Sequence, residues 1–597
     1  MCGIVGYVGR RDAVPVLLSG LSSLEYRGYD SSGIAVHNGA NLCVVKKAGR
    51  LCALQDLLSQ KEVKGRCGIG HTRWATHGVA TDLNAHPFVS TYGKFAVVHN
   101  GIITNYLSLA AFLQERGVRF VSDTDSEVIA HLLDYYYTGD VLAALARVLS
   151  LLKGSFALAV LSVFEPQVVY GVRKDSPLIV GKGDKEFALC SDISGISDFC
   201  TRFYPLKNNE IVKVSEEGVA LFDFNANPLS ISFEEAQKEE EEKREAGVDD
   251  MLSEIRQIPS SLLLGAEKFP QEQVRSLLKT DFSDIVVLGC GSAYHAGLTF
   301  CEAMRELCCV PVRAEVASEF LTERCYVNKH TLVISVSQSG ETADTLLATE
   351  KAKRAGATVL AICNVQASSL VRLAHLSLIT RCGKERAVAA TKTYVAQVWY
   401  LLKICLEYAD IKGKINKEQL SFYRRELALL CNKAQQVIGE ESFVEKAALA
   451  AKDAEAVFFL GRKGDYAACR EGSLKLKEVS YLFSEAYPSG ELKHGTLALM
   501  ERGVYGVIVA TDFALVERNV ATLSEIVCRG ASPIVVTTEE LAAVFPADYV
   551  ITLPSAPPVF TPVLSAVVMQ YFAYFIAKAR GCDVDKPRNL AKSVTVE

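Results

Sequence analysis

The second residue of the sequence, Cys2, carries the functional group from which the most chemistry could follow. Removal of the initiator Met1 would leave a thiol nucleophile and a free α-amine on one residue. A nucleophile activated by its own terminal amine is a known catalytic arrangement, and an α-amine with a reference pKa of roughly 7.7 to 8.0 suits proton transfer near neutrality. Cys2 could also be a buried cysteine at the start of an edge strand, one of eighteen in the chain.

A pair of residues near position 100 could complete a thiol active site. Asn100 and Gly101 follow the alternating apolar run 94–99. An amide side chain and a backbone N–H could donate to the tetrahedral oxyanion that a thiol forms from an amide substrate. An Asn-Gly pair after alternating residues is also the commonest tight hairpin turn, so the pair could instead be structural.

Arg73 and Asp125 could recognise the two charged ends of an amino-acid substrate. Arg73 lies in the segment 71–78, beside Trp74, and an arginine can grip a carboxylate through two hydrogen bonds. Asp125 could bind an α-amine. The apolar spacing of residues 128, 129, 132 and 133 predicts a helix over 125–137, with Thr124 as its cap, so Asp125 could equally be an acid facing a helix dipole.

A second cluster of polar residues lies at 337–342, with the sequence Ser-Gln-Ser-Gly-Glu-Thr. It falls between a buried strand and a predicted helix over 343–355, where hydroxyls and backbone N–H groups form an anion site. Because the cluster lacks a lysine, it favours a phosphate on a neutral sugar over a magnesium nucleotide. A capping box, in which Ser339 or Thr342 satisfies the helix start, is the alternative.

Glu471, Lys475 and Glu478 are spaced so that they share one helix face. A solvated ladder of salt bridges is the ordinary interpretation of that spacing. With His494, which follows shortly after, the same residues offer the acid and base groups of an aldose-ketose interconversion.

The elements that would position these residues change character along the chain. Short alternating runs dominate up to about residue 219, which suggests an α+β layered domain. A charged segment, 234–245, marks a boundary. Beyond it, buried strands alternate with longer helices, as in parallel βαβ construction. The strand end at Gly289 recurs at Gly461, and the turn at Gly356 recurs at Gly530, so we predict a duplicated doubly wound domain.

Length and composition limit the class of protein. A chain of 597 residues, 49 % apolar and 22 % charged, allows two to four globular domains. A net charge of -5 argues against nucleic-acid and anionic-membrane partners. There is no signal peptide pattern, and the apolar run 563–579 is short and interrupted by polar residues. No cysteine pair has zinc-ligand spacing, so we expect reduced thiols in the cytoplasm and no metal.

The chain resembles a known family over its whole length. Residues 2–6, 25–31, 71–78, 84–87 and 99–101 are similar to the N-terminal-cysteine glutamine amidotransferases. With the second half included, the chain resembles the glucosamine-6-phosphate synthases. The resemblance implies glutamine-dependent conversion of fructose 6-phosphate to glucosamine 6-phosphate and glutamate, with internal transfer of ammonia, no cofactor, and a homodimer with sites completed across the interface. The pathway implied is hexosamine synthesis.

The resemblance also implies a domain plan. It places an Ntn-hydrolase-like αββα glutaminase over 2–219, a charged linker over 220–275, SIS (sugar isomerase) domains over 276–415 and 447–587, and a catalytic tail over 588–597.

The family's functional residues carry over position by position. In the glutaminase, Cys2 is implied as the nucleophile and Asn100 and Gly101 as the oxyanion hole, and the glutamine contacts are Arg73, Trp74, Thr76, His77, His86 and Asp125. Trp74 would gate the ammonia path. In the isomerase, the implied catalytic residues are Glu471, Lys475, Glu478, His494 and Lys592. Among them Glu478 is the base, His494 assists ring opening, and Lys592, in a tail that is otherwise expected to be disordered, forms an imine with the ketose. The implied sugar phosphate contacts are Ser292, Ser337, Gln338, Ser339, Thr342, Val388 and Ala389.

The match departs from the family pattern at Ala293, Ala390 and Thr496, none of which is a charged catalytic position. We expect altered affinity there and no change of reaction. Two rival functions remain at this point. One is an amidotransferase making phosphoribosylamine, for which no pyrophosphate loop with paired acids is found. The other is a non-catalytic sugar-phosphate sensor, against which the joint presence of Cys2, Asn100, Glu478 and Lys592 argues.

Overall fold

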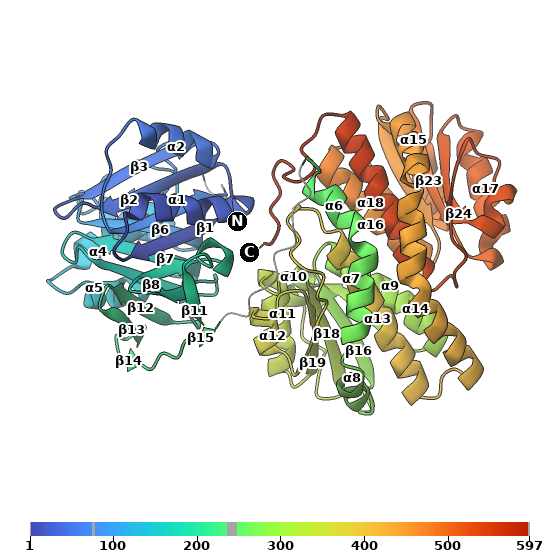
Figure 1. The fold of residues 1–597 in the computed structure, drawn as a ribbon, viewed down its shortest axis with the longest axis horizontal. Helices are drawn as coiled ribbons and strands as arrows, with labels where there is room; N and C mark the ends of the chain where they lie inside the picture. The colour runs from blue at the N-terminus through green and yellow to red at the C-terminus, as the bar shows by residue number, and fades with distance from the viewer. Residues whose placement is uncertain (1, 75–77, 236–246, 595–597) are drawn as a thin grey trace. The chain divides into compact units, whose positions relative to one another are not determined.

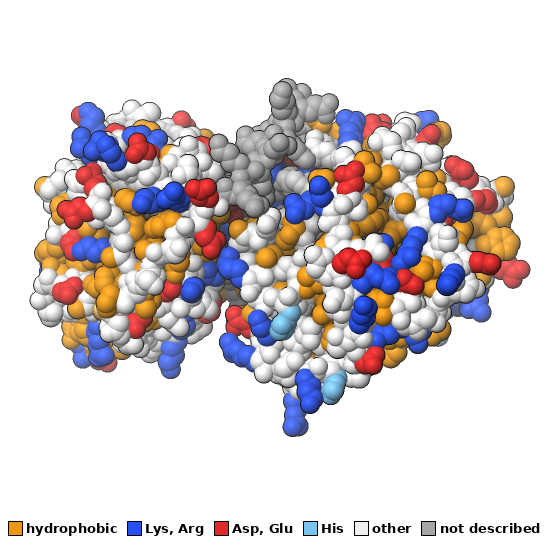
Figure 2. All heavy atoms as spheres, turned by 60° about the horizontal axis from the view of Figure 1, so that its bottom comes forward, with side chains coloured by type: hydrophobic (Ala, Val, Ile, Leu, Met, Phe, Trp, Pro, Cys, Tyr) orange, Lys and Arg blue, Asp and Glu red, His pale blue; other side chains and the backbone are white. Residues whose placement is uncertain are grey.

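The computed structural model describes residues 2–74, 78–235 and 247–594. It divides into two compact units, each shown in Figure 1: Met1–Lys238 with Ser593–Glu597, and Glu239–Lys592. On the face shown in Figure 2, lysine and arginine side chains are interspersed with aspartate and glutamate.

The first unit is built on two antiparallel sheets. The eight-stranded sheet has the order β15-β11-β9-β10-β1-β4-β2-β3, and the seven-stranded sheet the order β14-β13-β12-β8-β7-β6-β5. The strands are β1 Gly3–Val8, β2 Ser31–His37, β3 Leu42–Ala48, β4 Cys67–Arg73, β5 Phe88–Val89, β6 Phe95–Ile103, β7 Gly154–Ser162, β8 Val168–Lys174, β9 Ile179–Gly183, β10 Phe187–Cys190, β11 Cys200–Pro205, β12 Glu210–Ser215, β13 Gly218–Asp223, β14 Pro228–Leu229 and β15 Glu234–Glu235. The helices are α1 Ala13–Leu24, α2 Leu51–Ser59, α3 Tyr106–Gln114, α4 Glu127–Tyr136 and α5 Val141–Leu149, with short 3₁₀ helices η1 Glu25–Arg27 and η2 Ile193–Gly195.

Alternation along the strands creates four layers in this unit. In β1, Ile4 and Val8 lie in the core between the sheets, whereas Val5 and Tyr7 pack beneath α1 and α2. In β6, Val98 faces the inter-sheet core and Val97 packs with α4 and α5. Because successive side chains of a strand point to opposite faces, each sheet buries both of its faces. The predicted αββα layering is confirmed.

The second unit contains two parallel five-stranded sheets of the same topology, β17-β16-β18-β19-β20 and β22-β21-β23-β24-β25. Their strands are β16 Asp284–Gly289, β17 Val312–Val316, β18 Thr331–Ser337, β19 Thr358–Cys363, β20 Leu376–Ile379, β21 Ala456–Gly461, β22 Ser484–Pro488, β23 Val504–Ala510, β24 Ser532–Thr538 and β25 Tyr549–Leu553. The helices are α6 Asp250–Arg256, α7 Ile258–Lys268, α8 Gln271–Leu278, α9 Ser292–Cys308, α10 Ala317–Thr322, α11 Ala343–Arg354, α12 Ser369–Leu373, α13 Lys392–Ile411, α14 Lys417–Gly439, α15 Glu441–Ala451, α16 Gly464–Ser480, α17 Val516–Val527 and α18 Thr561–Ala579, with η3 Ser489–His494, η4 Thr496–Leu499, η5 Phe513–Leu515 and η6 Glu539–Val544. The predicted duplication is confirmed.

The two sheets of the second unit share one core. Ile285 and Val287 of β16 pack with α9 and α13, and Val457 and Phe459 of β21 belong to the same cluster. The intervening residue Val286 packs on the opposite face, with α10 and α11. Strands buried on both faces explain the continuous apolar runs in the sequence.

Helices α6 and α7 show that the predicted linker, 220–275, is too long. Their side chains Met251, Ile255, Ile258 and Leu262 are part of the core of the second unit. The charge run that suggested a boundary covers only the residues before α6, because the apolar periodicity of 251–262 is that of a core helix.

Helix α18 contains the long apolar run near the end of the chain. By length and composition it could cross a membrane, but 83 % of its most apolar window is buried within the structure. It packs against α15 and α16 in the shared core. The apolar surface of α18 is therefore already covered by the chain itself.

Candidate active sites

The register of β1 on β4 places Cys2 beside the end of β4. Gly3 pairs with Thr72, so Cys2 lies next to Arg73 and Trp74. The Trp74 backbone N–H donates to the Cys2 Sγ at 3.2 Å, and the thiol faces the Trp74 carbonyl oxygen at 3.6 Å. Burial raises the pKa of the Cys2 thiol, whereas the charges of Arg73 and Arg27 act in the opposite direction. The sulfur is thus held in place by the backbone of Trp74.

The backbone of Cys2 is fixed by two side chains. Its carbonyl oxygen accepts from Arg27 Nε at 3.3 Å and from Asn100 Nδ2 at 3.1 Å. Asn100 Nδ2 also donates to Ser191 Oγ at 2.9 Å. To donate to an oxyanion, Asn100 would have to exchange one of these two bonds, so in this structure it positions Cys2.

Asn100 and Gly101 lie inside β6, where Gly101 pairs with Phe156 of β7. The hairpin interpretation is therefore wrong. Gly101 has a φ of 128°, and a Cβ there would lie 2.0 Å from the Ser155 carbonyl oxygen. Only glycine fits at this approach of two strands. The strand carries Asn100 and Gly101 past the thiol because β6 continues beyond the sequence signal for a turn.

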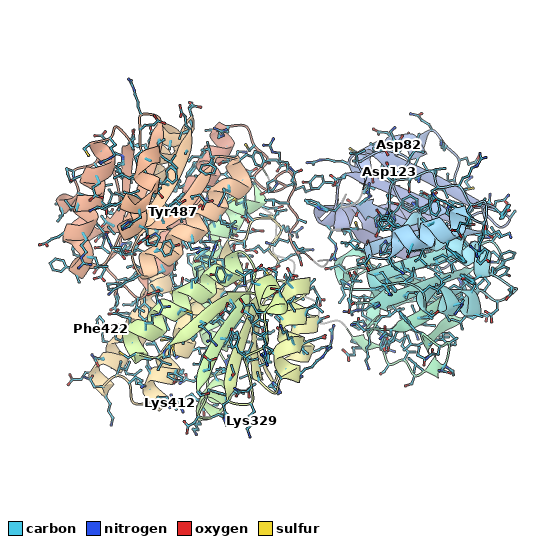
Figure 3. All side chains as sticks on the ribbon, turned by 180° about the vertical axis from the view of Figure 1, so that it is seen from behind. Asp82, Asp123, Lys329, Lys412, Phe422 and Tyr487 are labelled. Carbon is cyan, nitrogen blue, oxygen red and sulfur yellow. The ribbon has the colours of Figure 1, made fainter. Side chains whose placement is uncertain are left out.

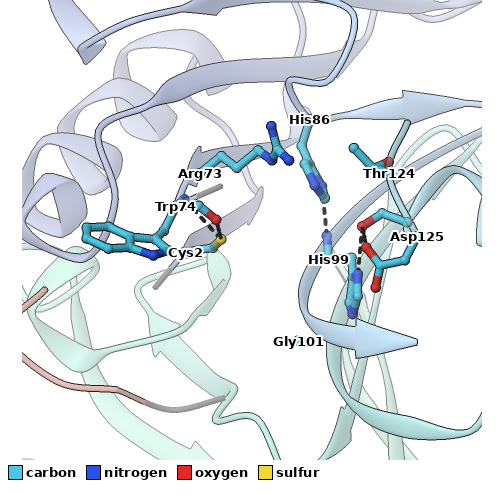
Figure 4. Close-up of a pocket in the computed structure, with 9 residues that line it drawn as sticks. Cys2, Arg73, Trp74, His86, His99, Gly101, Thr124 and Asp125 are labelled. Atoms are coloured by element: carbon cyan, nitrogen blue, oxygen red, sulfur yellow. Dashed lines mark hydrogen bonds between the residues drawn. The ribbon is translucent and has the colours of Figure 1, made fainter. Parts of the chain in front are cut away.

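A small pocket opens at the thiol (Figure 4). Residues from β1, β4, β6 and the loops before β5 and α4 line it: Cys2, Arg73, Trp74, His86, His99, Gly101, Thr124, Asp125 and Ser126. Four predicted glutamine contacts, Arg73, Trp74, His86 and Asp125, thus meet Cys2 and Gly101 in one place. The predicted contacts Thr76 and His77 lie outside the described residues.

Asp125 precedes the helix that was predicted to contain it. Helix α4 begins at Glu127, which is the acid of its first turn. Asp125 Oδ2 accepts from the Ile103 backbone N–H at 2.7 Å, and its side chain faces the pocket. Asp125 therefore lies just before α4, and its other carboxylate oxygen accepts from Ser126 Oγ at 3.3 Å beside the pocket.

Two stacked histidines support this pocket. They were not identified as a pair from the sequence. His71 and His86 stack with ring centroids 4.1 Å apart. His71 Nε2 lies 3.0 Å from Asn100 Oδ1 and 3.0 Å from the His99 carbonyl oxygen. Burial lowers the pKa of His71 to about 3 and that of His86 well below its ordinary value. Both rings are therefore neutral, and His71 acts by orienting Asn100.

In the second unit, the predicted phosphate loop joins β18 to α11. Ser337 Oγ accepts from the Gly340 N–H at 3.0 Å and contacts Thr342 Oγ1 at 3.1 Å, and Ser339 Oγ accepts from the Glu341 N–H at 3.1 Å. Thr342 precedes α11 without a side-chain capping bond. Gly340, at a φ of 64°, lies against Ser368, where a Cβ would come within 2.2 Å of Oγ. The loop lies at the switch point between β16 and β18, where α/β sheets bind ligands.

The second repeat fills the equivalent place with its own carboxylate. Asp465 Oδ2 accepts from the Thr511 N–H at 2.9 Å, and Oδ1 accepts from Thr511 Oγ1 at 2.6 Å. Burial raises the pKa of Asp465 to about 6. A buried acid thus occupies the hydrogen-bond donors that follow β23, which explains why only the first repeat retains an open loop.

The predicted acid-base residues of α16 are buried, so a solvated ladder is the wrong interpretation. Glu471 and Lys475 are fully buried, and Lys475 Nζ lies 2.5 Å from Glu478 Oε2 and 3.4 Å from Glu471 Oε1. Burial opposes the charge of Lys475, but the two carboxylates outweigh it and raise its pKa. Burial also raises the pKa of Glu478, although the positive charge of Lys475 acts in the opposite direction. Glu478 is the more accessible of the two carboxylates, with its side chain 20 % exposed against 0 % for Glu471.

Glu471 joins the two SIS repeats. It accepts from Ser292 Oγ at 2.8 Å, and its other oxygen lies 2.9 Å from His295 Nδ1. Both partners belong to the first turn of α9, next to the phosphate loop. The predicted sugar contact Ser292 is thereby placed beside the predicted catalytic helix, and His295, which sequence reasoning missed, orients Glu471.

Lys592 reaches this region from the C-terminal tail. Its ammonium donates to Glu385 Oε2, and its charge lowers the pKa of Glu478 against the effect of burial. Val388, a predicted sugar contact, uses its backbone N–H for the Asp585 carbonyl oxygen at 3.0 Å. Ala389 is buried. Glu385 was missed because no local pattern links it to a residue more than two hundred positions away.

His494 is the predicted residue that is not gathered with the others. It is exposed at the end of η3. Within the described part of the chain, no hydrogen bond or ion pair joins it to Glu471, Lys475, Glu478 or Lys592. The described residues contain no group of three or more His, Cys, Asp or Glu side chains that could hold a metal ion.

Comparisons with known proteins agree with this geometry. A family profile described as a SIS domain matches residues 280–402 and 452–577, and one described as a glutamine amidotransferase domain matches 71–198. The chain is 42 % identical over 608 residues to the glutamine–fructose-6-phosphate aminotransferase (isomerising) of Clostridium tetani, and 40 % identical over 603 residues to that of Aquifex aeolicus, with 100 % of each chain covered.

A solved structure extends the comparison to the second unit. The C-terminal domain of glucosamine-fructose-6-phosphate aminotransferase from Francisella tularensis covers 58 % of this chain and 100 % of that one, with a TM-score of 0.55 and 32 % identity. Since full-length relatives match the entire chain and both domain types are present, the chain belongs to the glutamine–fructose-6-phosphate aminotransferase (isomerising) family.

Proposed function

We propose that this chain transfers the amide nitrogen of glutamine to fructose 6-phosphate, giving glucosamine 6-phosphate and glutamate. Membership of the family supports the reaction. The observation that carries the residue assignments is that one chain holds both a pocketed Cys2 and, in its second unit, a buried acid-base helix next to an open phosphate loop. Neither rival function accounts for both sites.

In the first unit, Cys2 attacks the carboxamide carbon of glutamine. The α-amine of processed Cys2 accepts the thiol proton and returns it to the leaving nitrogen, so that ammonia departs and a thioester remains. Water then releases glutamate. Arg73 binds the α-carboxylate and Asp125 the α-amine, while the Gly101 N–H and, after exchange of one bond, Asn100 donate to the oxyanion.

In the second unit, the loop 337–342 and Ser292 hold the sugar phosphate. Lys592 forms an imine at C2 of the open-chain ketose with loss of water, and ammonia then displaces the lysine to leave a C2 imine. Glu478 moves a proton from C1 to C2 while the C1 hydroxyl proton passes to the imine nitrogen, so that C1 becomes an aldehyde and C2 carries an amine. Lys475 stays protonated between its two carboxylates and stabilises the charge that develops during this transfer. The result is a 2-amino aldose phosphate.

We also propose internal transfer of ammonia, a homodimer and a cytoplasmic location. Internal transfer of ammonia follows from the presence of both activities in one chain. A homodimer is supported by the exposed position of His494, which could serve a site on a second copy. Eighteen free thiols fit a reducing compartment, so we place the enzyme in the cytoplasm. The domain limits 2–219, 276–415 and 447–587, with a tail from 588, stay predictions.

The decisive test compares Cys2→Ala with Cys52→Ala, an exposed cysteine of the same unit. Glutamate release and glutamine-dependent formation of glucosamine 6-phosphate are measured together. Loss of the nucleophile should lower both rates on the order of 10³-fold or more, because groups that act as a unit are nearly all-or-none. Cys52→Ala should behave as wild type. Undiminished amination by Cys2→Ala would refute the assignment.

A further inference from the structure

The tail lysine has a buried counter-ion that the reaction scheme above does not use. The side chain of Lys592 is 6 % exposed and that of its partner Glu385 is 0 % exposed, although Lys592 lies only five residues from the end of the chain. A buried ion pair in an irregular tail needs support from its surroundings, because desolvation of both charges is costly.

That support comes from the loop between β20 and α13. Glu385 Oε1 accepts from the Thr391 N–H at 2.9 Å, from Thr391 Oγ1 at 3.1 Å and from the Thr393 N–H at 3.1 Å. Its Oε2 accepts from Thr393 Oγ1 at 2.7 Å in addition to Lys592. With this many donors, the carboxylate is fixed before the lysine arrives. Lys592 and these donors hold the pKa of Glu385 at about 2, against the effect of burial.

A second buried carboxylate supports the first. One carboxyl oxygen of Glu254, in α6, accepts from the backbone N–H groups of Arg386 and Ala387, and the other lies 3.1 Å from Thr391 Oγ1. Burial and the charge of Glu385 raise the pKa of Glu254 to about 8. Since one of the two acids is protonated near neutrality, the pair carries a single negative charge opposite the single positive charge of Lys592.

The same loop and helix also anchor the start of the tail. The Asp585 carbonyl oxygen accepts from the Val388 N–H, and its carboxylate accepts from the Asp250 N–H at 2.9 Å and the Met251 N–H at 2.8 Å at the start of α6. Farther along, the Arg588 N–H donates to the Tyr481 hydroxyl at 2.7 Å. The tail is thus attached at residues 585, 588 and 592.

We propose that Glu385 is the positioning residue of Lys592: it holds the lysine nitrogen over the sugar site and remains its counter-ion when the imine forms. This inference rests on the proposed role of Lys592. Condensation of the ammonium form with the C2 carbonyl breaks the C=O bond, forms a C=N bond and releases water, so the nitrogen is positively charged before and after the step. Glu385 therefore stabilises the lysine and the iminium alike, and Glu254 fixes the loop that carries it.

The test is reductive trapping of the imine with borohydride on the full-length chain supplied with fructose 6-phosphate. Mass spectrometry of the peptide that contains Lys592 gives the rate of adduct formation. The Lys592→Ala variant gives the background rate. Glu385→Gln should lower both trapping and sugar conversion by about 10²-fold, because the lysine nitrogen is no longer held in position for the C2 carbonyl, with a smaller change in KM for fructose 6-phosphate. Glu385→Asp, which keeps the charge, should recover part of the loss.

Two controls separate positioning from folding. Glu407 is another fully buried carboxylate of this unit, paired with Arg275, Lys403 and Arg424, and Glu407→Gln should trap the imine as wild type does. Lys329→Ala removes an exposed lysine of the second unit, labelled in Figure 3, and should change nothing. Should Glu385→Gln be unstable, Thr393→Val removes only the hydroxyl that orients Oε2 and should lower trapping less.

The outcomes distinguish this inference from the proposed function. An adduct that forms equally fast in wild type and in Glu385→Gln would overturn the positioning role and leave the imine in place. An equal loss in Glu407→Gln would assign the effect to general destabilisation and would also overturn it. If wild type forms no adduct at Lys592, the imine itself is refuted, and the inference falls with the proposed function.

Discussion

His71 and His86 form a neutral, stacked pair next to the thiol pocket, and this gives the first unit a defined sensitivity to acid. The pKa of His71 is about 3 in the folded chain because of burial, against about 6.5 in an unfolded one. Between these values the unfolded state binds the extra proton, so stability is complete above about pH 6.5 and is lost as the pH falls toward 3.

We predict that the first unit loses about 2 kcal/mol through His71 alone between pH 7 and pH 5, since one pKa unit corresponds to about 1.4 kcal/mol. Trp74 and Trp399 are the only tryptophans, so in a Trp399→Phe background the fluorescence of Trp74 follows urea unfolding of the first unit. His71→Gln should reduce the pH dependence. His330→Gln, an exposed histidine of the second unit, should not, and equal slopes for all variants would contradict the prediction.

At the scale of single residues, the sequence often identified one residue of an interacting pair and missed the other. Cys2, Arg73 and Asp125 were found from type and position, and the fold brings them to one pocket. Glu385, Glu254 and His295 were missed because their meaning depends on Lys592 and Glu471, which are distant in sequence. A lone glutamate in a loop carries no sign of the lysine that it binds.

At the scale of elements, α16 carries both the proposed acid-base residues and side chains of the core. Within the described structure, Lys475 is the only cation of α16 that pairs with Glu471 and Glu478. Lys477, two residues later, is exposed and pairs with Glu485 at 3.2 Å. The two lysines thus offer a buried and an exposed ion pair in the same helical turn.

Lys475→Met should therefore destabilise the second unit by about 3 to 5 kcal/mol and abolish sugar conversion, because it leaves the buried Glu471 and the half-buried Glu478 without their shared cation. Lys477→Met should cost less than about 1 kcal/mol and leave conversion unchanged, since exposed pairs contribute little. Urea unfolding followed by Trp399 fluorescence measures both. Similar midpoints for the two variants would show that the triad is not a buried electrostatic unit.

The ends of a helix or strand could be predicted where the local sequence determines them. The predictions failed where contacts with neighbouring elements determine them. The helix predicted over 343–355 is α11, Ala343–Arg354, because a polar cap and a following glycine limit it. Strand β6 runs through the Asn-Gly pair because β7 supplies partners up to Ile103. Helices α6 and α7 were assigned to a linker because the charge run before them obscured their apolar faces.

At the scale of the whole molecule, the chain is two compact units with one type of chemistry in each. The first contains the thiol pocket and the second contains both SIS repeats, which share a single core and cannot be separated from one another. The solved C-terminal domain from Francisella tularensis covers the second unit by itself. Each unit therefore has its own core, and we predict that the covalent connection between the units serves the proposed transfer of nitrogen and neither fold.

We predict that a chain divided after Lys238, giving residues 1–238 and 239–597, yields two folded proteins with uncoupled activities. The first should release glutamate from glutamine, because every described residue of the thiol pocket lies within it. The second should bind fructose 6-phosphate without using glutamine.

In the intact enzyme, glutamate and glucosamine 6-phosphate should appear in equal amounts. An equimolar mixture of the two pieces at nanomolar concentration should produce glutamate in large excess, since ammonia is then diluted into solvent. Equal yields from the dilute mixture would show that nitrogen reaches the sugar without a shared chain, and would refute internal transfer while leaving both active sites as assigned.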